Sequence, residues 1–472
     1  MRGPRLMPSC GLLRCRAAIA ALLITGCARL PNLEKVKTPL NTPIAAPAAA
    51  PVNPTVVTGQ GPLSDKAAAA AIPQRRGISK VDAKTMAGFE EATTGRPLIA
   101  GNKVTLLFDG PRTIAAMMAA VAAAKDTINL ETYLFDQDPL GLAFANLLIA
   151  KQKEGVQVCI IYDCVGTLGT PEAFFTRMKE AGIHLLPFHP AMPLHNFGRW
   201  RLNNRDHRKI LVVDGKVGFA GGVNITAAYS RGSQFRSGGT GGLKMGWRDT
   251  HLQIEGPAVS ALQWLFLDNW ASQKADKLPE RDYFPELAPA GDKVLRVLAS
   301  QPGGEHEVFK AYYLAIQGAR KSIHLTAAYF VPDSQIKRAL LDAARRGVDV
   351  KLILPSVTDG ALVFQASHSH YASMLAAGIK IYELKTALLH AKTAVVDGSW
   401  ATVGSTNMDT RSFLHNKEVN IVVIGDAFGQ EMESAFQEDL KDSNEITLEQ
   451  WKRRPWLQRA KERLARLLAY WL

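Results

Sequence analysis

The sequence predicts an α/β protein with two homologous lobes, each a mostly parallel sheet flanked by helices. Two observations support this prediction. Strand-like apolar segments alternate with helix-length segments, which is typical of parallel sheets covered by helices. The order of these segments in the first half of the chain also recurs in the second half, which indicates an internal duplication.

The first half begins with a helix-like segment at residues 114–124. A buried strand is expected at residues 127–135, because apolar and β-branched residues dominate it. A second helix at residues 140–153 ends before Gly155, a residue suited to terminate a helix. The chain then returns as a strand at residues 156–162, so one strand–helix–strand unit is complete.

The second half repeats this unit. A helix at residues 308–319 precedes a strand at residues 322–330, and a helix at residues 334–346 ends before Gly347. A strand follows at residues 348–354. Each half then has a helix that ends in Ala-Gly-Ile, at residues 181–183 and 377–379.

Composition is that of a globular protein with a basic surface. Of the 472 residues, 47% are hydrophobic and 21% are charged, which is enough to bury two sizeable cores. The formal net charge is +13 with a pI near 9.5. A basic protein favours an anionic partner, either nucleic acid or an acidic membrane surface, and charge alone does not choose between them.

Residues 1–26 have the pattern of a secretory signal. Four arginines precede an apolar run at residues 17–24, which is too short to cross a bilayer comfortably. Cys27 follows Thr-Gly and resembles the lipobox of bacterial lipoproteins, which implies cleavage before Cys27 and its acylation. The expected location is a bacterial cell envelope, lipid-anchored and facing the periplasm, with the outer membrane favoured by Ala28. A plain signal peptide or an uncleaved anchor is the alternative.

Residues 27–75 are rich in proline and alanine and are expected to form a tether. Two cysteines lie in the folded part, Cys159 and Cys164. Because they are five residues apart around a strand end, a disulfide between them would need a tight turn. We interpret both as packing residues.

A polar motif occurs once in each half. The first copy is His-x-Lys-x4-Asp, followed after six residues by Gly-Gly-x-Asn, and the second repeats every spacing with Gly-Ser-x-Asn. One copy would arise by chance in roughly a few per cent of chains this long, whereas two copies with matching tails indicate a function. The polar residues of the two copies are His207, Lys209, Asp214 and Asn224, and His390, Lys392, Asp397, Ser405 and Asn407.

The residue types in the motif suit a phosphate. Alternate side chains of a strand share a face, so His207 and Lys209 point the same way and favour an anion. Glycines let the backbone approach closely and an asparagine adds an amide donor, which suits phosphate oxygens. Asp214 and Asp397 follow a stretch of apolar strand, so we expect them to hold a turn rather than to touch substrate.

The doubled motif resembles the signature of the phospholipase D superfamily, in which His-x-Lys-x4-Asp-x6-Gly-(Gly/Ser)-x-Asn occurs twice. Within it, the sequence is most similar to bacterial cardiolipin synthases of the phospholipase D type, over about residues 100–440. The narrower resemblance rests on the phrases at residues 101–107, 128–133, 205–209 and 246–251.

The resemblance implies two facing lobes with the active site between them. One histidine attacks phosphorus to give a phosphohistidine, and the other protonates the leaving oxygen and later activates the acceptor. His207 is favoured as the nucleophile. Lys209, Lys392 and the phosphate-binding residues Asn224, Ser405 and Asn407 would meet the phosphoryl charge, so no metal ion or other cofactor is expected.

Two further acids are candidates for orienting the imidazoles, Asp249 and Glu418. An acid on one ring nitrogen fixes the tautomer and supports the positive charge that forms during reaction. Because the two acids lie 42 and 28 residues beyond the motif histidines, two ordinary surface acids are the alternative.

The C-terminus predicts a basic amphipathic helix. Apolar residues recur at helical spacing from Trp456 to Trp471, and four basic residues lie between them. Such a helix is typical of a membrane-surface element, and a helix docked on the protein's own core is the alternative. The expected divisions of the chain are a signal peptide (1–26), a tether (27–75), a first domain with its lead-in (76–285), a second domain (286–445) and the C-terminal helix (446–472).

The hypothesis is a phosphatidyltransferase that moves a phosphatidyl group through a phosphohistidine to the alcohol of a second phospholipid. The alternatives are a phospholipase D-type lipid hydrolase and, less favoured, a metal-independent phosphodiesterase or nuclease. The anchor and the C-terminal helix favour phospholipid substrates and a bacterial membrane surface, and no nucleic-acid partner is expected. Both motifs lie in one chain, so a monomer can be active.

Overall fold

The computed structural model describes residues 28–34, 54–72, 83–189, 203–230, 246–273 and 275–470. The expected signal segment, Cys27 and the middle of the expected tether lie outside these residues. The chain divides into two compact units, residues 1–31 and 32–472, and the helices and strands of the described residues belong to the second unit.

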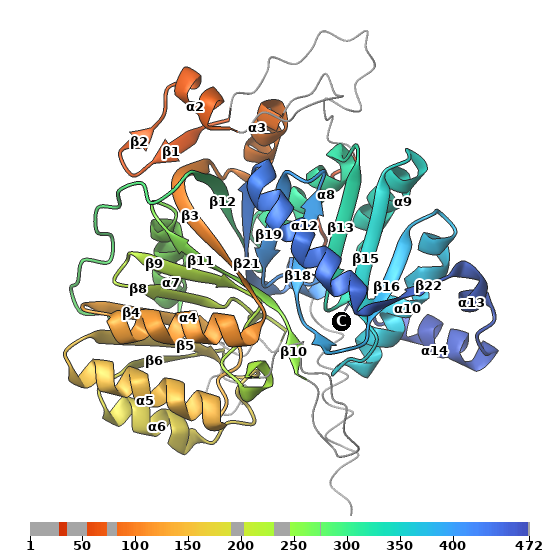
Figure 1. The fold of residues 1–472 in the computed structure, drawn as a ribbon. Coiled ribbons are helices and arrows are strands. Elements are labelled where there is room, and N and C mark those ends of the chain that lie inside the picture. The colour runs from red at the N-terminus through yellow and green to blue at the C-terminus, as the bar shows by residue number, and fades with distance from the viewer. Residues whose placement is uncertain are drawn as a thin grey trace, which may run out of the picture. The chain divides into compact units, whose positions relative to one another are not determined.

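The first half of the chain forms a sheet with parallel and antiparallel parts (Figure 1). The parallel strands alternate with helices in the order α4 (Gly110–Ala123), β4 (Thr127–Thr132), α5 (Pro139–Lys153), β5 (Gln157–Asp163), α6 (Glu172–Glu180) and β6 (His184–Phe188). Antiparallel strands continue the sheet beyond β4, in the spatial order β8 (Ile210–Val213), β9 (Val217–Gly221), β11 (Thr250–Glu255) and β3 (Leu98–Phe108).

The second half repeats this arrangement strand for strand. Its helices and parallel strands are α8 (Glu307–Gly318), β13 (Ser322–Ala327), α9 (Ser334–Arg345), β15 (Asp349–Pro355), α10 (Ala361–Leu375) and β16 (Lys380–Leu384). Its antiparallel strands are β18 (Lys392–Val396), β19 (Trp400–Gly404), β21 (Asn416–Ile424) and β12 (Lys293–Ser300). A further strand, β22 (Ser443–Ile446), pairs with β16.

The prediction of mostly parallel sheets is wrong, because each sheet is mixed. Each motif strand turns back on itself, at Asp214-Gly215 in the hairpin β8–β9 and at Asp397-Gly398 in β18–β19. All four turn residues have positive φ angles, which is the conformation that a tight hairpin requires and that Asp-Gly favours. The two sheets are also joined edge to edge by the antiparallel pairing of β3 with β12, so the halves share one continuous sheet.

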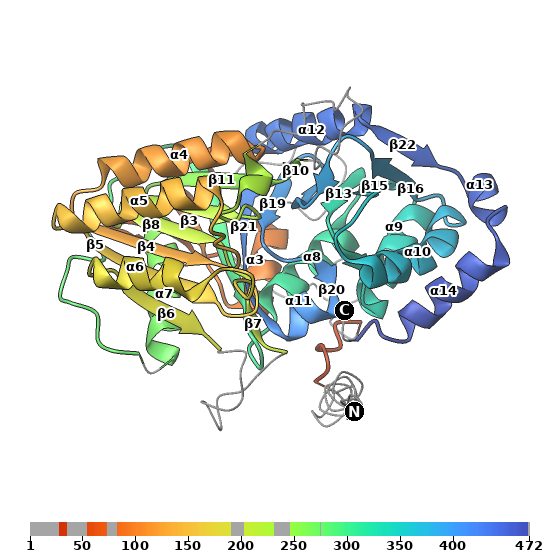
Figure 2. The same cartoon turned by 90° about the horizontal axis from the view of Figure 1, so that it is seen from below.

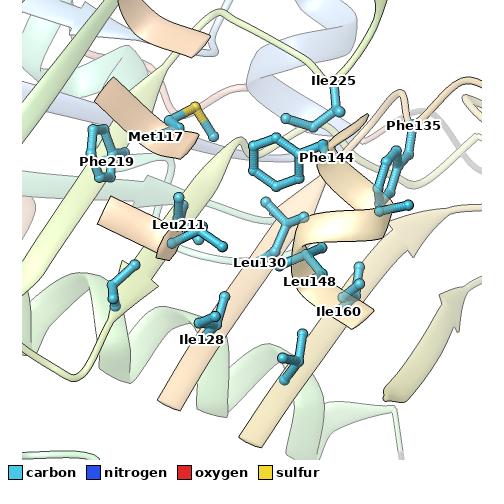
Figure 3. Close-up of a cluster of buried hydrophobic side chains, with 14 of the residues drawn as sticks. Met117, Ile128, Leu130, Phe135, Phe144, Leu148, Ile160, Leu211, Phe219 and Ile225 are labelled. Atoms are coloured by element: carbon cyan, nitrogen blue, oxygen red, sulfur yellow. The ribbon is translucent and has the colours of Figure 1, made fainter. Parts of the chain in front are cut away.

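Helices cover both faces of this sheet. In Figure 2, α4 and α5 lie on one face of the first half and α7 (Val259–Ser272) lies on the other. Figure 3 shows how side chains of β4, β5, β8 and β9 interlock with Met117 of α4 and with Phe144 and Leu148 of α5. A second buried cluster runs through both halves and includes residues of α7 and of α12 (Asp426–Lys441), so the two halves share a core.

The expected tether is partly folded, which corrects the boundary at residue 75. Residues 54–72 contain β1 (Val56–Thr58), β2 (Gly61–Pro62) and α2 (Asp65–Ala71), and β1 pairs in parallel with β3. Val56 is completely buried there, and a helix α3 (Ala83–Thr94) follows. The high proline and alanine content of the sequence hides this short strand, which forms along the edge that β3 provides.

The C-terminal segment is helical, as predicted, but it contains two helices. α13 (Leu448–Lys452) ends before Pro455, and α14 (Trp456–Arg466) begins directly after it. Trp451 of α13 is buried and stacks on Tyr371 of α10, with ring centroids 4.6 Å apart. In the part of the chain that the structure describes, no helix is both long and apolar enough to cross a membrane. The thiols of Cys159 and Cys164 are both free.

Candidate active site

Two short strand pairings between the halves position the motif histidines. β7 (Arg205–Asp206) pairs in parallel with the first two residues of β21. The backbone N–H of His207 then donates to the carbonyl of Lys417 at 2.9 Å. Because pairing residues advance together along parallel strands, His207 lies next to Glu418 of the other half.

The second histidine is positioned in the same way. β10 (Trp247–Arg248) pairs in parallel with β17 (Leu388–Leu389). The N–H of His390 donates to the carbonyl of Arg248 at 2.8 Å, which brings His390 beside Asp249. Each histidine therefore meets an acid that the opposite half of the chain supplies.

The contacts between histidines and acids are short and buried. His207 Nδ1 lies 3.0 Å from both carboxylate oxygens of Glu418, and His390 Nδ1 lies 2.7 Å from Asp249 Oδ2. Both acid side chains are completely buried, whereas 10% and 7% of the two histidine side chains are exposed. An Nδ1–H that donates to a carboxylate leaves Nε2 as the free ring nitrogen, so each imidazole is held in one orientation and one tautomer.

The two acids differ in protonation, although burial lowers the pKa of both histidines. Burial and the charges of Lys209, Lys392 and His390 hold the pKa of His207 well below its ordinary value, so His207 is neutral near pH 7. Burial raises the pKa of Glu418 to about 7. Burial acts the same way on Asp249, but the charge and hydrogen bond of His390 outweigh it and lower the pKa of Asp249. The carboxylate beside His390 is therefore the more fully ionised one.

The two motifs lie close enough for their charges to act on one another. Lys392 and His390 of the second half act on His207 of the first, and Lys209 of the first half acts on His390. Two charged groups shift each other's pKa in this way only when they are separated by no more than about one Debye length. The duplicated residues thus form one site with two histidines and two lysines.

Ser405 corrects one of the predicted phosphate contacts. Its hydroxyl is completely buried and donates to Glu418 Oε2 at 2.5 Å, while the N–H of Val419 donates to it at 3.0 Å. Ser405 therefore supports the acid that holds His207 and is not free to bind a phosphate oxygen.

In the first half, different residues support the orienting acid, Asp249. Gly222 stands where Ser405 stands in the second motif, and a Cβ there would lie 2.1 Å from Asp249 Oδ1. Aspartate is one methylene shorter than glutamate, so its backbone must approach more closely and only glycine fits. The supporting hydroxyl comes instead from Tyr229, which lies 3.0 Å from Asp249 Oδ2 and 2.9 Å from His390 Nδ1.

Lys209 and Lys392 lie buried beside the histidines, and each ammonium donates to the backbone carbonyl of its own motif histidine. Burial lowers the pKa of Lys209 to about 7 and that of Lys392 to about 8. The buried amide Nδ2 of Asn224 makes no hydrogen bond with the described residues, so it is a donor left over for a ligand. Two cations and an amide donor in one site are suited to hold an anion with several oxygens.

Asp214 and Asp397 hold the hairpin turns that follow the two motif strands. The carboxylate of Asp214 accepts the N–H groups of residues 125–127, and that of Asp397 accepts those of residues 320–322. Each aspartate fastens its hairpin turn to the start of the next strand of the sheet, β4 for Asp214 and β13 for Asp397. This fits the expectation that these residues hold turns.

Sequence reasoning missed three aromatic residues of the site. Tyr133 contacts the edge of His207 with ring centroids 5.1 Å apart, and Trp247 packs against His390 at 4.8 Å. Both lie in the sequence phrases on which the family resemblance rests. The position of Trp247 directly before Arg248 and Asp249 was a signal that could have identified it as a site residue. Tyr229 had none, because the matching position of the second half, five residues after Asn407, holds Ser412 and not an aromatic residue.

The lysine pKa values predict a pH dependence of substrate binding. A lysine is cationic below its pKa and neutral above it, so the site loses positive charge as the pH rises through about 7 to 8. We expect the KM for a short-chain anionic phospholipid to increase over this range. Lys209→Arg should move the increase to higher pH, since a guanidinium stays charged. A KM that is constant or falls with rising pH would contradict this assignment.

A buried pair of oriented imidazoles, with cations and amides around them, defines a site for group transfer at phosphorus. Comparisons with known proteins agree with this class. A family model for "Cardiolipin synthase, PLD-like domain" matches residues 312–440. A solved phosphatidylserine synthase from Haemophilus influenzae Rd KW20 superposes with a TM-score of 0.61 at 13% identity, over 81% of this chain and 99% of that one, which shows a shared fold.

Relatives with similar sequences define the family within this class. The cardiolipin synthase of Halalkalibacterium halodurans is 34% identical over 421 residues, which is 86% of this chain and 81% of the relative. That of Geobacillus kaustophilus is 36% identical over 377 residues, or 79% and 73% of the two chains. The chain therefore belongs to the cardiolipin synthase family within the phospholipase D superfamily.

Proposed function

We propose that the protein is a phosphatidyltransferase of the cardiolipin synthase type, which joins a phosphatidyl group to the hydroxyl of a second phospholipid. The observation that carries this proposal is the convergence of both motifs, with their acids exchanged between the halves, in one site. Family membership supplies the substrate class, since the relatives are cardiolipin synthases.

In the first step, Nε2 of His207 attacks the phosphorus of the donor. A P–N bond forms, the P–O bond to the headgroup alcohol breaks, and the proton of His390 Nε2–H goes to the leaving oxygen. The neutral state of His207 suits a nucleophile, and the ionised Asp249 suits a histidine that must carry an extra proton. Lys209, Lys392, Asn224 and Asn407 would hold the phosphoryl oxygens while their charge grows.

In the second step, His390 has lost its proton and acts as the base. It removes the proton of the acceptor hydroxyl as that oxygen attacks the phosphohistidine, which restores both imidazoles. Water in place of the lipid alcohol would give phosphatidic acid, so hydrolysis is the competing outcome of the same chemistry.

Phosphatidylglycerol offered alone tests this function, since it carries both a phosphodiester and free hydroxyl groups. The purified protein should convert it to a diphosphatidyl lipid and free glycerol, read by mass spectrometry. Phosphatidic acid as the sole lipid product would identify a hydrolase instead. Absence of lipid products together with cleavage of DNA in the presence of EDTA would favour the phosphodiesterase alternative.

We also propose that the protein is a lipoprotein of a bacterial envelope, anchored through Cys27. The signal-like pattern before Cys27 supports this proposal. Cys27→Ser should abolish labelling by a radioactive fatty acid and increase the fraction recovered without membranes. Cys159→Ser is the matched control, because that thiol is buried within the folded part and should leave labelling unchanged. If labelling and membrane recovery both survive Cys27→Ser, the N-terminus is an uncleaved anchor.

A further inference from the structure

α14 docks on the protein with its small and polar face. Ala465 and Glu462 are buried, and α14 packs against α10, where Ala465 joins Val331 and Ala366 in a small cluster. Glu462 accepts from Arg454 at 2.6 Å, and the guanidinium of Arg454 lies 3.2 Å from the centroid of the Trp451 ring. These docking contacts therefore do not bury the large apolar side chains of α14 and of the turn that follows it.

Those apolar residues point away from the protein. Three of them lie within α14 and occupy an arc of about 100°, on the side opposite to Glu462. Leu467 and Leu468 lie in the turn that continues the helix. Together these five are half of the ten large hydrophobic side chains that are exposed among the described residues, although they come from one short segment. The five are Trp456 (75% exposed), Leu457 (53%), Leu464 (67%), Leu467 (77%) and Leu468 (44%), and we call them the α14 stripe.

The exposed charges beside the stripe all have one sign. Arg459, Lys461, Arg463 and Arg466 are exposed on α14, whereas the helix's one acid, Glu462, is buried and paired with Arg454. A second copy of the chain is a poor occupant, because pairing two stripes would bring eight like charges together. An anionic lipid surface accepts both features at once, since its headgroups are negative and its acyl region is apolar.

We propose that the α14 stripe inserts into the boundary between headgroups and acyl chains of an anionic bilayer. A tryptophan at one end and leucines along the arc provide the apolar contact, and the flanking basic residues meet lipid phosphates. None of the five residues of the α14 stripe belongs to the motifs or to the orienting acids.

α10 connects this surface to the active site. α10 and α14 lie side by side in Figure 2. The loop before α10 exposes Val357 and contains Asp359, which accepts from the hydroxyl of Tyr329 at 2.5 Å. The backbone carbonyl of Tyr329 accepts from the N–H of Met408 at 3.1 Å, and Met408 directly follows Asn407 of the second motif. A helix seated in the bilayer would thus hold this side of the site close to the lipid surface.

Quenching of tryptophan fluorescence by brominated acyl chains tests the insertion in the full-length protein. Vesicles of brominated phosphatidylcholine are prepared with and without phosphatidylglycerol, and emission is compared between the parent and Trp456→Phe. The difference isolates Trp456 even if another segment also binds the vesicle. We expect the Trp456 emission to shift to shorter wavelength and to be quenched, more strongly with phosphatidylglycerol present.

Trp264→Phe is the matched control, because Trp264 is also exposed (58%) on a helix, α7, that carries no such stripe. Its difference spectrum should show no quenching. Leu464→Glu combined with Leu467→Glu should abolish the quenching of Trp456 while circular dichroism shows an unchanged fold. Unquenched Trp456 on vesicles that bind the protein would overturn the proposal. So would a dimer, found by sedimentation without lipid, that the double variant converts to a monomer.

Discussion

Replacing either motif histidine by alanine should lower turnover by at least about a thousand-fold. In the proposed mechanism, His207→Ala removes the atom that forms the P–N bond, and His390→Ala removes the group that protonates the leaving oxygen and then activates the acceptor. Because both act in one sequence of steps, the double variant should be hardly slower than either single one. Turnover of phosphatidylglycerol by purified, correctly folded variants checks this expectation.

His184→Ala is a suitable control for this experiment, since His184 lies half-buried on β6 and takes no part in the site. It should retain near-parental activity. Substantial activity in either motif variant, or a double variant whose loss is the product of the single losses, would contradict a site in which the two histidines act as a unit.

Converting the orienting acids to amides should have the next largest effect, a loss in turnover of about 10³- to 10⁴-fold. Asp249→Asn and Glu418→Gln keep size and shape, but an amide cannot stabilise the positive imidazole and can present its NH₂ group to Nδ1. We expect Asp249→Asn to be the more harmful, because Asp249 serves the histidine that must carry the extra proton. Turnover and the melting temperature are measured together, so that lost stability is separated from lost chemistry.

A histidine–glutamate pair outside the site provides the control. His324 Nδ1 lies 2.8 Å from the carboxylate of Glu433, a contact as short as those in the site. Glu433→Gln should leave turnover near the parental value. Equal losses in Glu433→Gln and Glu418→Gln would mean that these acids contribute to folding and not to the reaction.

Tyr229→Phe tests the hydroxyl that contacts the pair formed by Asp249 and His390. It removes the hydroxyl that contacts both Asp249 and His390, while the ring still packs against Trp247. Loss of one hydrogen bond to a buried charge is worth about tenfold in turnover. The pH profile should change as well, because the pKa of the pair formed by Asp249 and His390 depends on that hydroxyl. An unchanged profile would assign Tyr229 a packing role alone.

How far the sequence predicts this protein depends on whether a feature is local. The twin motifs, the repeated strand–helix–strand units and the turn-holding role of Asp214 and Asp397 follow from short spacings, and the structure has them. From the sequence, the orienting acids could be named only as candidates, because each acid pairs with the histidine of the opposite half. Asp249 meets His390, and Glu418 meets His207, through strand pairs that join residues far apart in the chain.

The features that were missed depend mainly on contacts between distant residues. Ser405 occupies a phosphate-binding position by pattern, yet the buried Glu418 takes its hydroxyl. Tyr229 contributes a hydroxyl only because Gly222 leaves room for Asp249. The mixed sheet is different, since Asp-Gly after each motif strand is a local hairpin signal that the prediction of parallel sheets overlooked. The strand at Val56–Thr58 forms where β3 offers an edge, which composition cannot reveal.

We propose one site, built from residues of both halves, in which His207 carries the phosphatidyl group. The most direct test mixes the enzyme with phosphatidylglycerol labelled in its phosphate, quenches the reaction within one turnover under alkaline conditions, and locates the label by peptide mass spectrometry. We expect phosphohistidine on the peptide that contains His207, and we expect this label to be lost at the rate of product formation when unlabelled phosphatidylglycerol is added. Label on the peptide that contains His390, or product formed at full rate with no labelled peptide, would contradict it.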